Sequence, residues 1–274
     1  MKKQKDMPSK KTMVLERLYE ICKERDVYEF DNTLVKKVSA EIGFGNPFDA
    51  TKIDNKSGLP RKFRVNDIAV LHLGNGRHKF INGIDKIYHD FEPIEEYVKW
   101  NYRKSLLNQF NSSESNLLSI ANNQRILHHF LFGRDTELDD VDIMKRPKTY
   151  FPHRTKTSLQ YYVDDTYLEL DRIQLEIDLT IEFEGRIGIF EAKNGCPKNF
   201  SIYQLYHPFL YYYNANKDSS IQGRIKEVFG VYVVRMRYKY SNDIIRLWAY
   251  TFDVPTDMSS IRLIKSAEYE LINR

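Results

Sequence analysis

Residues 174–193 constrain this chain more than any other stretch, because they predict a β-hairpin. Residues 175–183 and 187–190 are rich in β-branched and apolar side chains, which favour strands. Between them stand Glu184 and Gly185, and the glycine can take the positive φ angle that a tight two-residue loop requires. In such a hairpin residue 183 pairs with residue 186, and the register continues outward from that pair.

This register separates charged from apolar side chains. Asp178 lies opposite Glu191 and Glu176 lies opposite Lys193, and because side chains alternate along a strand, all four point to one face. The other face receives apolar side chains, which predicts a core made of Ile177, Leu179, Ile181, Phe183, Phe190 and Ala192.

The charged face predicts a magnesium site. Two facing carboxylates repel each other unless a cation lies between them or one pKa is raised. Asp178, Glu191 and the backbone carbonyl of Ala192 offer the hard oxygen ligands that Mg²⁺ prefers. Lys193 could orient or deprotonate an attacking water. Glu176 could join a second metal ion or pair with Lys193, and the alternative for the whole face is a solvated strand with charges paired across it.

The pattern resembles the PD-(D/E)xK signature of restriction-endonuclease-like nucleases. Asp178 is followed, after a gap of twelve residues, by Glu191-Ala192-Lys193, and residues 199–213 supply the following helix with Gln204 near its start. The family's proline before the aspartate is replaced here by Ile177. The resemblance covers roughly residues 110–255.

The resemblance implies a Mg²⁺-dependent phosphodiesterase with a central mixed sheet flanked by helices. Asp178 and Glu191 would be metal ligands, Lys193 the catalytic lysine and Gln204 an auxiliary catalytic residue. A helix is predicted over residues 116–132. The resemblance implies that Glu114, just before this helix, and Arg125, within it, could lie beside the scissile phosphate.

Composition bounds the class of protein without choosing a function. The chain has 274 residues, of which 42% are hydrophobic and 29% charged, which is typical of a globular protein. It contains no apolar run of membrane-spanning length, and Cys22 and Cys196 suggest reduced thiols, so we expect a cytoplasmic protein that does not contact a membrane. The net charge of +4 is compatible with a polyanionic partner but does not require one.

The N-terminal third predicts a winged helix-turn-helix domain. Apolar spacing and end signals predict helices over residues 12–23, 32–42 and 46–53. Asn75-Gly76, between apolar runs at 68–73 and 78–81, predicts a hairpin that looks like a wing. The alternative is a small helical domain that contacts another protein.

Double-stranded DNA is the expected partner of this domain. Cations of the third helix, the following loop and the hairpin could contact phosphates, as could a basic run before the central strands. The candidate DNA-binding residues are Lys52, Arg61, Lys62, Arg64, Arg77, His78, Lys79, Arg154 and Lys156.

The expected organisation is a recognition domain with a connector over residues 1–110 and a nuclease domain over residues 111–274. The connector is expected to contain a helix over 94–109, and buried strands are expected at 228–234 and 244–252. The fold class is therefore α/β (α+β), with a winged helix-turn-helix domain followed by a restriction-endonuclease-like domain.

Together with a recognition domain, the resemblance implies a Mg²⁺-dependent type II restriction endonuclease with a cognate DNA methyltransferase in the same system. Two strand cuts would require either a homodimer or sequential nicking. The alternatives are a structure-directed repair or junction-resolving nuclease, and a non-enzymatic winged-helix regulator with an inactive nuclease-like domain.

Overall fold

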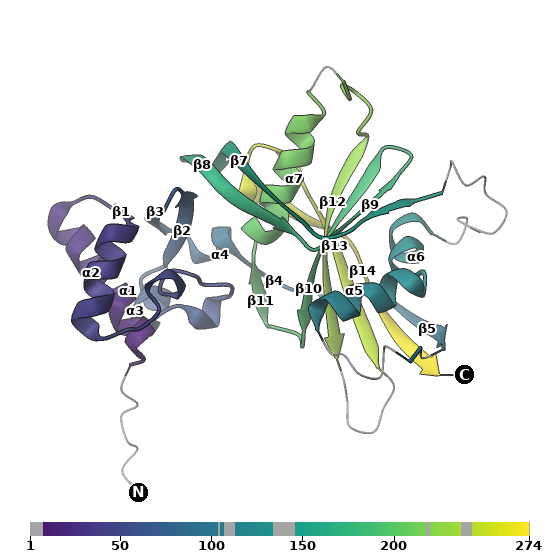
Figure 1. Cartoon of the computed structure of the whole chain (residues 1–274), viewed down its shortest axis with the longest axis horizontal. Coiled ribbons are helices and arrows are strands. Elements are labelled where there is room, and N and C mark those ends of the chain that lie inside the picture. Colours follow the sequence, from purple (N-terminus) through teal and green to yellow (C-terminus); the bar gives the residue numbers. More distant parts are fainter. Residues whose placement is uncertain are drawn as a thin grey trace, which may run out of the picture.

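The computed structural model describes residues 8–103, 105–106, 113–133, 146–217, 220–236 and 243–273. Over these residues the chain is a mixed α+β protein in which a helical N-terminal region with a small sheet lies beside a larger mixed sheet (Figure 1). The predicted α+β class and the central mixed sheet are confirmed. In the described ranges, no helix is long and apolar enough to cross a membrane.

Two helices with clear end signals open the N-terminal region. Helix α1 (Lys10–Arg25) begins at Ser9, whose side chain accepts a backbone hydrogen bond from the first turn. Helix α2 (Asn32–Ile42) is capped in the same way by Asp31 and ends at Gly43, which takes a φ of 72°. The first two predicted helices are confirmed.

The third helix predicted over residues 46–53 is wrong. Only a 3₁₀ turn forms, η1 (Pro47–Asp49), and residues 50–55 contain no helix. The carbonyl of Ile53 accepts a hydrogen bond from the Tyr88 hydroxyl at 3.4 Å, and the carbonyl of Asp54 accepts one from a backbone N–H of the C-terminal part at 3.0 Å. Long-range bonds thus replace the local ones that a helix would make.

Short elements lead from this segment to a hairpin. A second 3₁₀ turn, η2 (Lys56–Gly58), and the short helix α3 (Arg61–Val65) precede the strands. Strands β2 (Ile68–Gly74) and β3 (Arg77–Asn82) form the predicted hairpin, and the short strand β1 (Glu29–Asp31) pairs with β3, giving the order β1-β3-β2. We call this the N-terminal sheet.

The loop of this hairpin has the predicted conformation. Asn75 and Gly76 have φ angles of 47° and 72°, as a two-residue loop between twisted strands requires. Sequence therefore determined this turn correctly.

The main mixed sheet contains seven strands within the described residues. Its order is β5 (Glu96–Tyr102), β14 (Ile261–Asn273), β13 (Ile244–Phe252), β12 (Glu227–Met236), β10 (Arg186–Asn194), β9 (Leu179–Phe183) and β6 (Lys148–Tyr150). The β10–β12 and β5–β14 pairs are parallel, and the other neighbours are antiparallel. The predicted strands at 228–234 and 244–252 lie within β12 and β13 and are confirmed.

Helices cover both faces of the main sheet (Figure 1). Helices α5 (Glu114–Asn123) and α6 (Ile126–Phe132) pack on one face against apolar side chains that include Leu179 and Phe190. Helix α7 (Tyr203–Ala215), which follows the short strand β11 (Asn199–Ser201), packs on the other face. Burial on both faces explains why β12 is almost continuously apolar.

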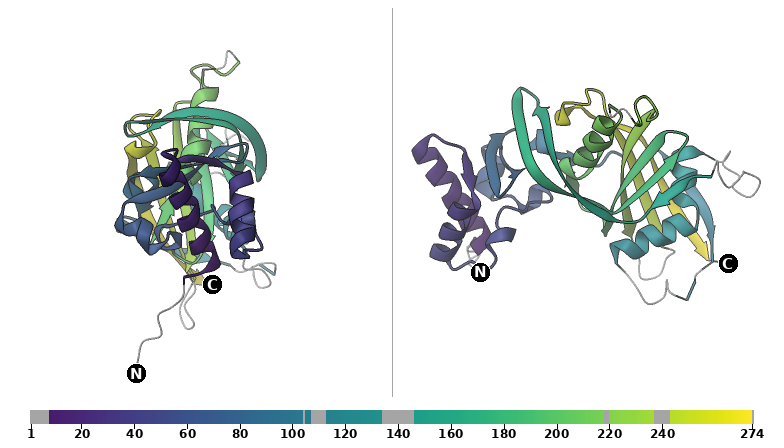
Figure 2. Two further views of the ribbon diagram at one scale, coloured as in Figure 1. Left: turned by 90° about the vertical axis from the view of Figure 1, so that its left-hand side faces the viewer. Right: turned by 45° about the horizontal axis from the view of Figure 1, so that its top comes forward.

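A long two-stranded ribbon lies between the main sheet and the N-terminal region (Figure 2). It consists of β7 (His153–Val163) and β8 (Thr166–Ile177), joined by the predicted turn at Asp164-Asp165. One continuous apolar cluster joins α1, the N-terminal sheet, the ribbon and α7. The N-terminal region is therefore packed against the rest of the chain.

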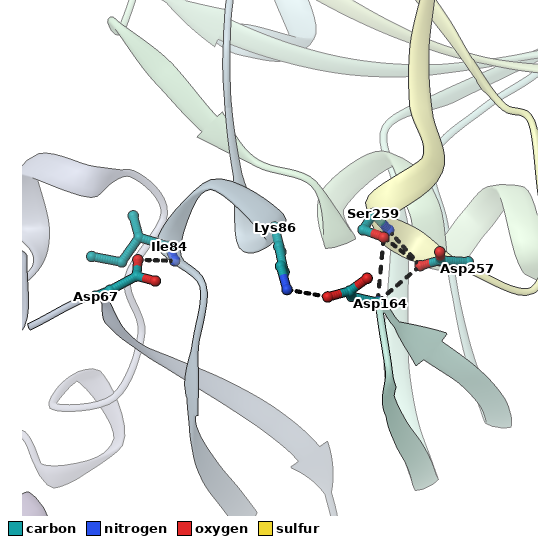
Figure 3. A network of polar contacts seen from close by, with 6 residues as sticks. All are labelled: Asp67, Ile84, Lys86, Asp164, Asp257 and Ser259. Carbon is teal, nitrogen blue, oxygen red and sulfur yellow. Dashed lines mark hydrogen bonds and ion pairs between the residues drawn. The ribbon is translucent and has the colours of Figure 1, made fainter.

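Polar contacts fix the same junction (Figure 3). Helix α4 (Ile84–Ile87) carries Lys86, which forms an ion pair with Asp164 at the ribbon turn. The backbone N–H of Asp164 donates to Asp257, 3.2 Å away, and to Ser259 of η5 (Met258–Ser260), 3.3 Å away. The ribbon turn thus bonds both to the N-terminal region and to the segment before β14.

The expected boundary after residue 110 and the expected connector helix are wrong. Residues 96–102 form β5, which pairs with β14 at the edge of the main sheet, and β4 (Tyr88–Asp90) pairs with β11. The C-terminal part therefore begins directly after β3. The helix expected over 116–132 is present but is divided into α5 and α6 at Arg125, whose φ is 63°.

Candidate active site

The β9–β10 hairpin has the predicted register. Its pairs run from Phe183 with Arg186 to Leu179 with Phe190, as a two-residue loop requires. Glu184 and Gly185 have φ angles of 52° and 83°. The predicted core face is confirmed for Leu179, Ile181, Phe190 and Ala192, which lie in one buried cluster, while Ile177 packs in another and Phe183 is partly exposed.

The β9–β10 strand pairing ends at Leu179 with Phe190, one pair before the predicted pair of Asp178 with Glu191. Asp178 lies in a bend between β8 and β9, and its Oδ2 accepts a hydrogen bond from the backbone N–H of Ala192 at 3.1 Å. The N–H and C=O of one strand residue point to the same edge, so the Ala192 carbonyl also lies on the side of Asp178. The direct pairing of Asp178 with Glu191 is thus replaced by a contact one residue further along β10.

The predicted pairing of Glu176 with Lys193 is wrong. Because β8 leaves the main sheet at the bend, Glu176 faces Arg154 on β7. Arg154 donates from Nε and Nη2 to one carboxylate oxygen of Glu176, at 3.0 and 2.5 Å. Both side chains are largely exposed, although Glu176 still borders the cavity described next.

Asp178, Glu191, Lys193 and Gln204 line one cavity of about 410 Å³, which we call the carboxylate cavity. They reach it from the β8–β9 bend, from β10 and from α7, so the sheet and the helix that follows it hold them together. Further lining residues come from α5 and from the N-terminal region: Glu114, Lys52 and Asp54.

Hydrogen bonds converge on one oxygen of Glu191. Its Oε1 accepts from Lys193 Nζ at 2.8 Å and from Gln204 Nε2 at 3.1 Å. Glu114 Oε2 lies 3.6 Å from Lys193 Nζ, so two carboxylates flank the lysine. Within the described residues, the Oε1 atom of Gln204 is buried and has no hydrogen-bond partner. A buried polar atom without a partner is uncommon in folded proteins, which sets this amide apart from ordinary core residues.

Burial controls the charges of these groups. Burial raises the pKa of Glu191 to about 7, although Lys193 opposes the shift. Burial also raises the pKa of Asp178, against the hydrogen bond from Ala192. Burial disfavours the charged form of Lys193, but Glu191, Glu114 and Asp178 together outweigh that effect, so the pKa of Lys193 is raised. The cavity therefore contains two acids that a cation would help to ionise, beside a lysine held in its charged form.

These residues fit a divalent cation through the chemistry of their donors. Asp178 and Glu191 line the cavity, and the Ala192 carbonyl lies on the strand edge that faces Asp178. Mg²⁺ usually takes few protein ligands and keeps several waters. Over the described residues there is no group of three or more His, Cys, Asp or Glu side chains that could hold a metal ion. A site here would thus rely on two carboxylates and a carbonyl.

The candidate DNA-binding residues fall into different surroundings. Arg61, Lys62 and Arg64 are exposed on α3, where Lys62 lies 3.4 Å from Glu20. Lys79 pairs with Glu29 at 3.1 Å, and Arg154 is engaged by Glu176. Lys52 and Lys156 share a second cavity beside the carboxylate cavity.

The prediction that His78 contacts DNA is wrong. His78 is 2% exposed, its Nε2 lies 3.0 Å from Asn32 Oδ1, and its ring stacks on Phe30. Burial lowers the pKa of His78 to about 3. Strand β1, which brings Phe30 onto β3, was absent from the predicted elements, and its presence explains the error.

The β2–β3 hairpin is not a projecting wing. The Asn75 side chain bonds to Asp171 on β8, and Arg77 Nη2 donates to the Glu169 carbonyl at 3.3 Å. A Cβ atom added to Gly74 would lie 1.9 Å from the Asp171 carbonyl oxygen. The tip of this hairpin is therefore docked on the ribbon.

Sequence reasoning missed several residues of the two cavities. Tyr203 and His207 line both cavities and stand four positions apart on α7, so helical spacing next to Gln204 could have indicated them. Asp54 enters the carboxylate cavity from a distant segment, and no local signal pointed to it. Glu114 and Arg125 were both expected beside the scissile phosphate. Glu114 lines the carboxylate cavity, and Arg125 does not.

Comparison with known protein families divides the chain after β3, where the C-terminal part begins in the structure. The fold and site define an α+β protein whose carboxylates, lysine and amide meet at one end of a hairpin. Residues 83–270 match the family described as domain of unknown function DUF6997, and the chain belongs to this family. Residues 12–80 match a second description, domain of unknown function DUF6996. No curated protein and no solved structure matched the chain.

Proposed function

We propose that this protein is a Mg²⁺-dependent endonuclease that hydrolyses phosphodiester bonds in double-stranded DNA. The observation that carries the proposal is the convergence of Asp178, Glu191, Lys193 and Gln204 on one cavity, with both acids largely withdrawn from water. Structural ion pairs also perturb pKa values, but they do not usually leave a buried amide oxygen unpaired beside them.

Each group has a role that follows from its position. Asp178, Glu191 and the Ala192 carbonyl would hold the metal ion, which when bound supplies Lewis-acid stabilisation and a lowered pKa for water. Lys193, charged and next to Glu191, would orient the attacking water and stabilise negative charge on the phosphate. Gln204 donates to Glu191, so it would hold that carboxylate in position beside the water and the phosphate.

The order of elements supports the resemblance to PD-(D/E)xK nucleases. The acidic hairpin β9–β10 is followed by α7, and β12 returns parallel to β10. In the N-terminal region, the order helix, short strand, helix, short helix and hairpin, with β1 beside β3, supports a winged-helix domain. A recognition domain before a nuclease suits a type II restriction endonuclease, which would require a cognate DNA methyltransferase.

One observation favours a second candidate function. The tip of the β2–β3 hairpin is occupied by β8, so it does not supply the free contact that a wing makes with DNA. A structure-directed nuclease, which needs few base contacts, would tolerate this arrangement.

Phage DNA incubated with the purified protein tests the proposal. We expect cleavage in Mg²⁺, none in EDTA, and none with Asp178→Asn. Discrete fragment ends would support restriction, whereas preferential cutting of branched DNA would support the second candidate. Cleavage by Asp178→Asn at the wild-type rate would refute the assignment of the site, and binding of DNA without any cleavage would indicate a regulator with an inactive nuclease-like domain.

A further inference from the structure

A second cavity, of about 450 Å³, opens next to the carboxylate cavity. Gln174, Tyr203 and His207 line both, as does Lys52 of the N-terminal region, so the two cavities adjoin each other. The second cavity is formed between β2 of the N-terminal region and the β7–β8 ribbon, which are packed against each other by the docked hairpin.

Three cations from separate segments line the second cavity. Lys52 follows η1, Lys156 lies on β7 and Arg172 lies on β8. All three are exposed, and in the part of the chain that the structure describes none of them forms an ion pair with an acid. Three unneutralised cations in a concave surface attract anions, because the low-dielectric walls focus the field of the charges.

The backbone is deformed where it presents Arg172. Ser158 on β7 stands opposite two residues of β8, Asp171 and Arg172, which is a β-bulge. Arg172 has a φ of 50°, a conformation that favours glycine, and its N–H donates to the Ser158 hydroxyl at 3.2 Å. Bulges re-aim side chains and occur next to active sites. The extra residue keeps Leu170 and Ile173 in the core while Arg172 points to the cavity side.

We propose that this second cavity binds the DNA phosphates that neighbour the scissile phosphate, through Lys52, Lys156 and Arg172. The inference rests on the proposed function and adds the path of the DNA strand. A strand whose reacting phosphate lies between Asp178 and Lys193 continues into the adjoining cavity, where cations replace the carboxylates as lining groups. Because Lys52 belongs to the N-terminal region, that region contributes directly to substrate binding.

Arg172→Gly is the sharpest test, since glycine adopts the bulge conformation without strain and only the cation is lost. Binding of a fluorescent duplex is measured by anisotropy in EDTA, in a Lys193→Ala background that excludes cleavage. We expect Arg172→Gly to weaken binding about tenfold at low salt, the effect of losing one charge-assisted hydrogen bond. The slope of log K against log salt should fall by about 0.9 for each cation removed, so the triple variant with Lys52→Ala and Lys156→Ala should lose about three such steps.

Lys99→Ala, an exposed cation on edge strand β5, serves as the matched control and should leave affinity and slope unchanged. The melting temperature of Arg172→Gly should equal or exceed that of the parent, which excludes unfolding as the cause of weaker binding. Wild-type affinity in the triple variant would overturn the phosphate path while leaving the nuclease proposal intact. The phosphate path would also be overturned if the three substitutions weakened binding of inorganic phosphate or a mononucleotide but left the affinity for the duplex unchanged. Absence of both DNA binding and cleavage in the wild type would overturn both proposals.

Discussion

The β2–β3 and β9–β10 hairpins have the same kind of loop and opposite surroundings. Each turns through two residues with positive φ, Asn75-Gly76 in one and Glu184-Gly185 in the other. The tip of β2–β3 is docked on β8 and its charged strand is half buried against β1. The open end of β9–β10 instead borders a cavity lined by carboxylates.

The difference shows what local sequence does and does not determine. Turn residues fix the loop of both hairpins, and alternation fixes the register of β9–β10, whereas the register of β2–β3 shifts between His72 and Gly74. The neighbours that pack against each hairpin then decide which polar groups remain accessible: His78 is buried and neutral, whereas Glu191 is withdrawn from water but faces a cavity. Equivalent hairpins thus serve packing in one region and a candidate site in the other.

The largest stability effect should come from filling the contact between β2–β3 and the ribbon. Gly74→Ala adds a Cβ at a φ of 80°, 1.9 Å from the Asp171 carbonyl oxygen. Strain and overpacking together should lower the free energy of unfolding by about 3 kcal/mol. Urea denaturation measures the change. The control is Gly223→Ala, which has a φ of 71° but nothing within 4 Å, and which should cost only about 1 kcal/mol. Equal losses in the two variants would contradict the docked tip.

At β9–β10, by contrast, a substitution that removes a buried charge should raise the free energy of unfolding. The pKa of Glu191 is raised from 4.5 to about 7, so the folded state holds the proton more tightly than the unfolded state and stability falls as pH rises through 7. Glu191→Gln removes this cost, and in EDTA at pH 8 it should be more stable than the wild type by about 3 kcal/mol. The advantage should disappear near pH 4.5. A destabilised variant at pH 8 would show that the pair with Lys193 outweighs burial.

His78 should produce a pH dependence with the reverse sign at β2–β3. The pKa of His78 is lowered from 6.5 to about 3, so between these values the unfolded state binds a proton that the folded state excludes. Stability should therefore fall as pH drops below 6.5. Between pH 6.5 and pH 5.5 the wild type should lose about 1 kcal/mol more than His78→Gln. Parallel pH profiles for the two proteins would contradict a neutral, buried His78.

The smallest change in stability should come from breaking the Arg154–Glu176 ion pair, which forms in place of the predicted contact of Glu176 with Lys193. Arg154 and Glu176 are exposed by 66% and 56% of their side-chain areas, and solvent screens such pairs. Arg154→Ala should change the free energy of unfolding by no more than about 0.5 kcal/mol. A loss above that size, measured by thermal denaturation, would mean that this pair holds β7 to β8 at the bend.

Local signals predicted much of the fold. Apolar spacing located α1, a cap and a terminal glycine helped to locate α2, and the turn residues located both hairpins and the ribbon turn. The same register brought Asp178, Glu191 and Lys193 into reach of one another, and the helix after the hairpin added Gln204. These features depend on interactions between residues close in sequence.

Errors arose where distant segments decide the outcome. Residues 96–102 have apolar side chains compatible with a helix, but pairing with β14 makes them a strand. Residues 50–55 bond to β11 and Tyr88 instead of forming a helix. Glu176 faces Arg154 because β8 leaves the sheet, a departure that no pattern within the hairpin could indicate.

Cleavage of supercoiled plasmid in Mg²⁺ by the wild type, Lys193→Ala and Lys99→Ala tests most directly whether the carboxylate cavity is the centre of a nuclease. We predict that the wild type and Lys99→Ala cut at the same rate and that Lys193→Ala is slower by about a thousandfold, as expected for loss of a positioned catalytic group. Cutting by Lys193→Ala at the wild-type rate would contradict the account.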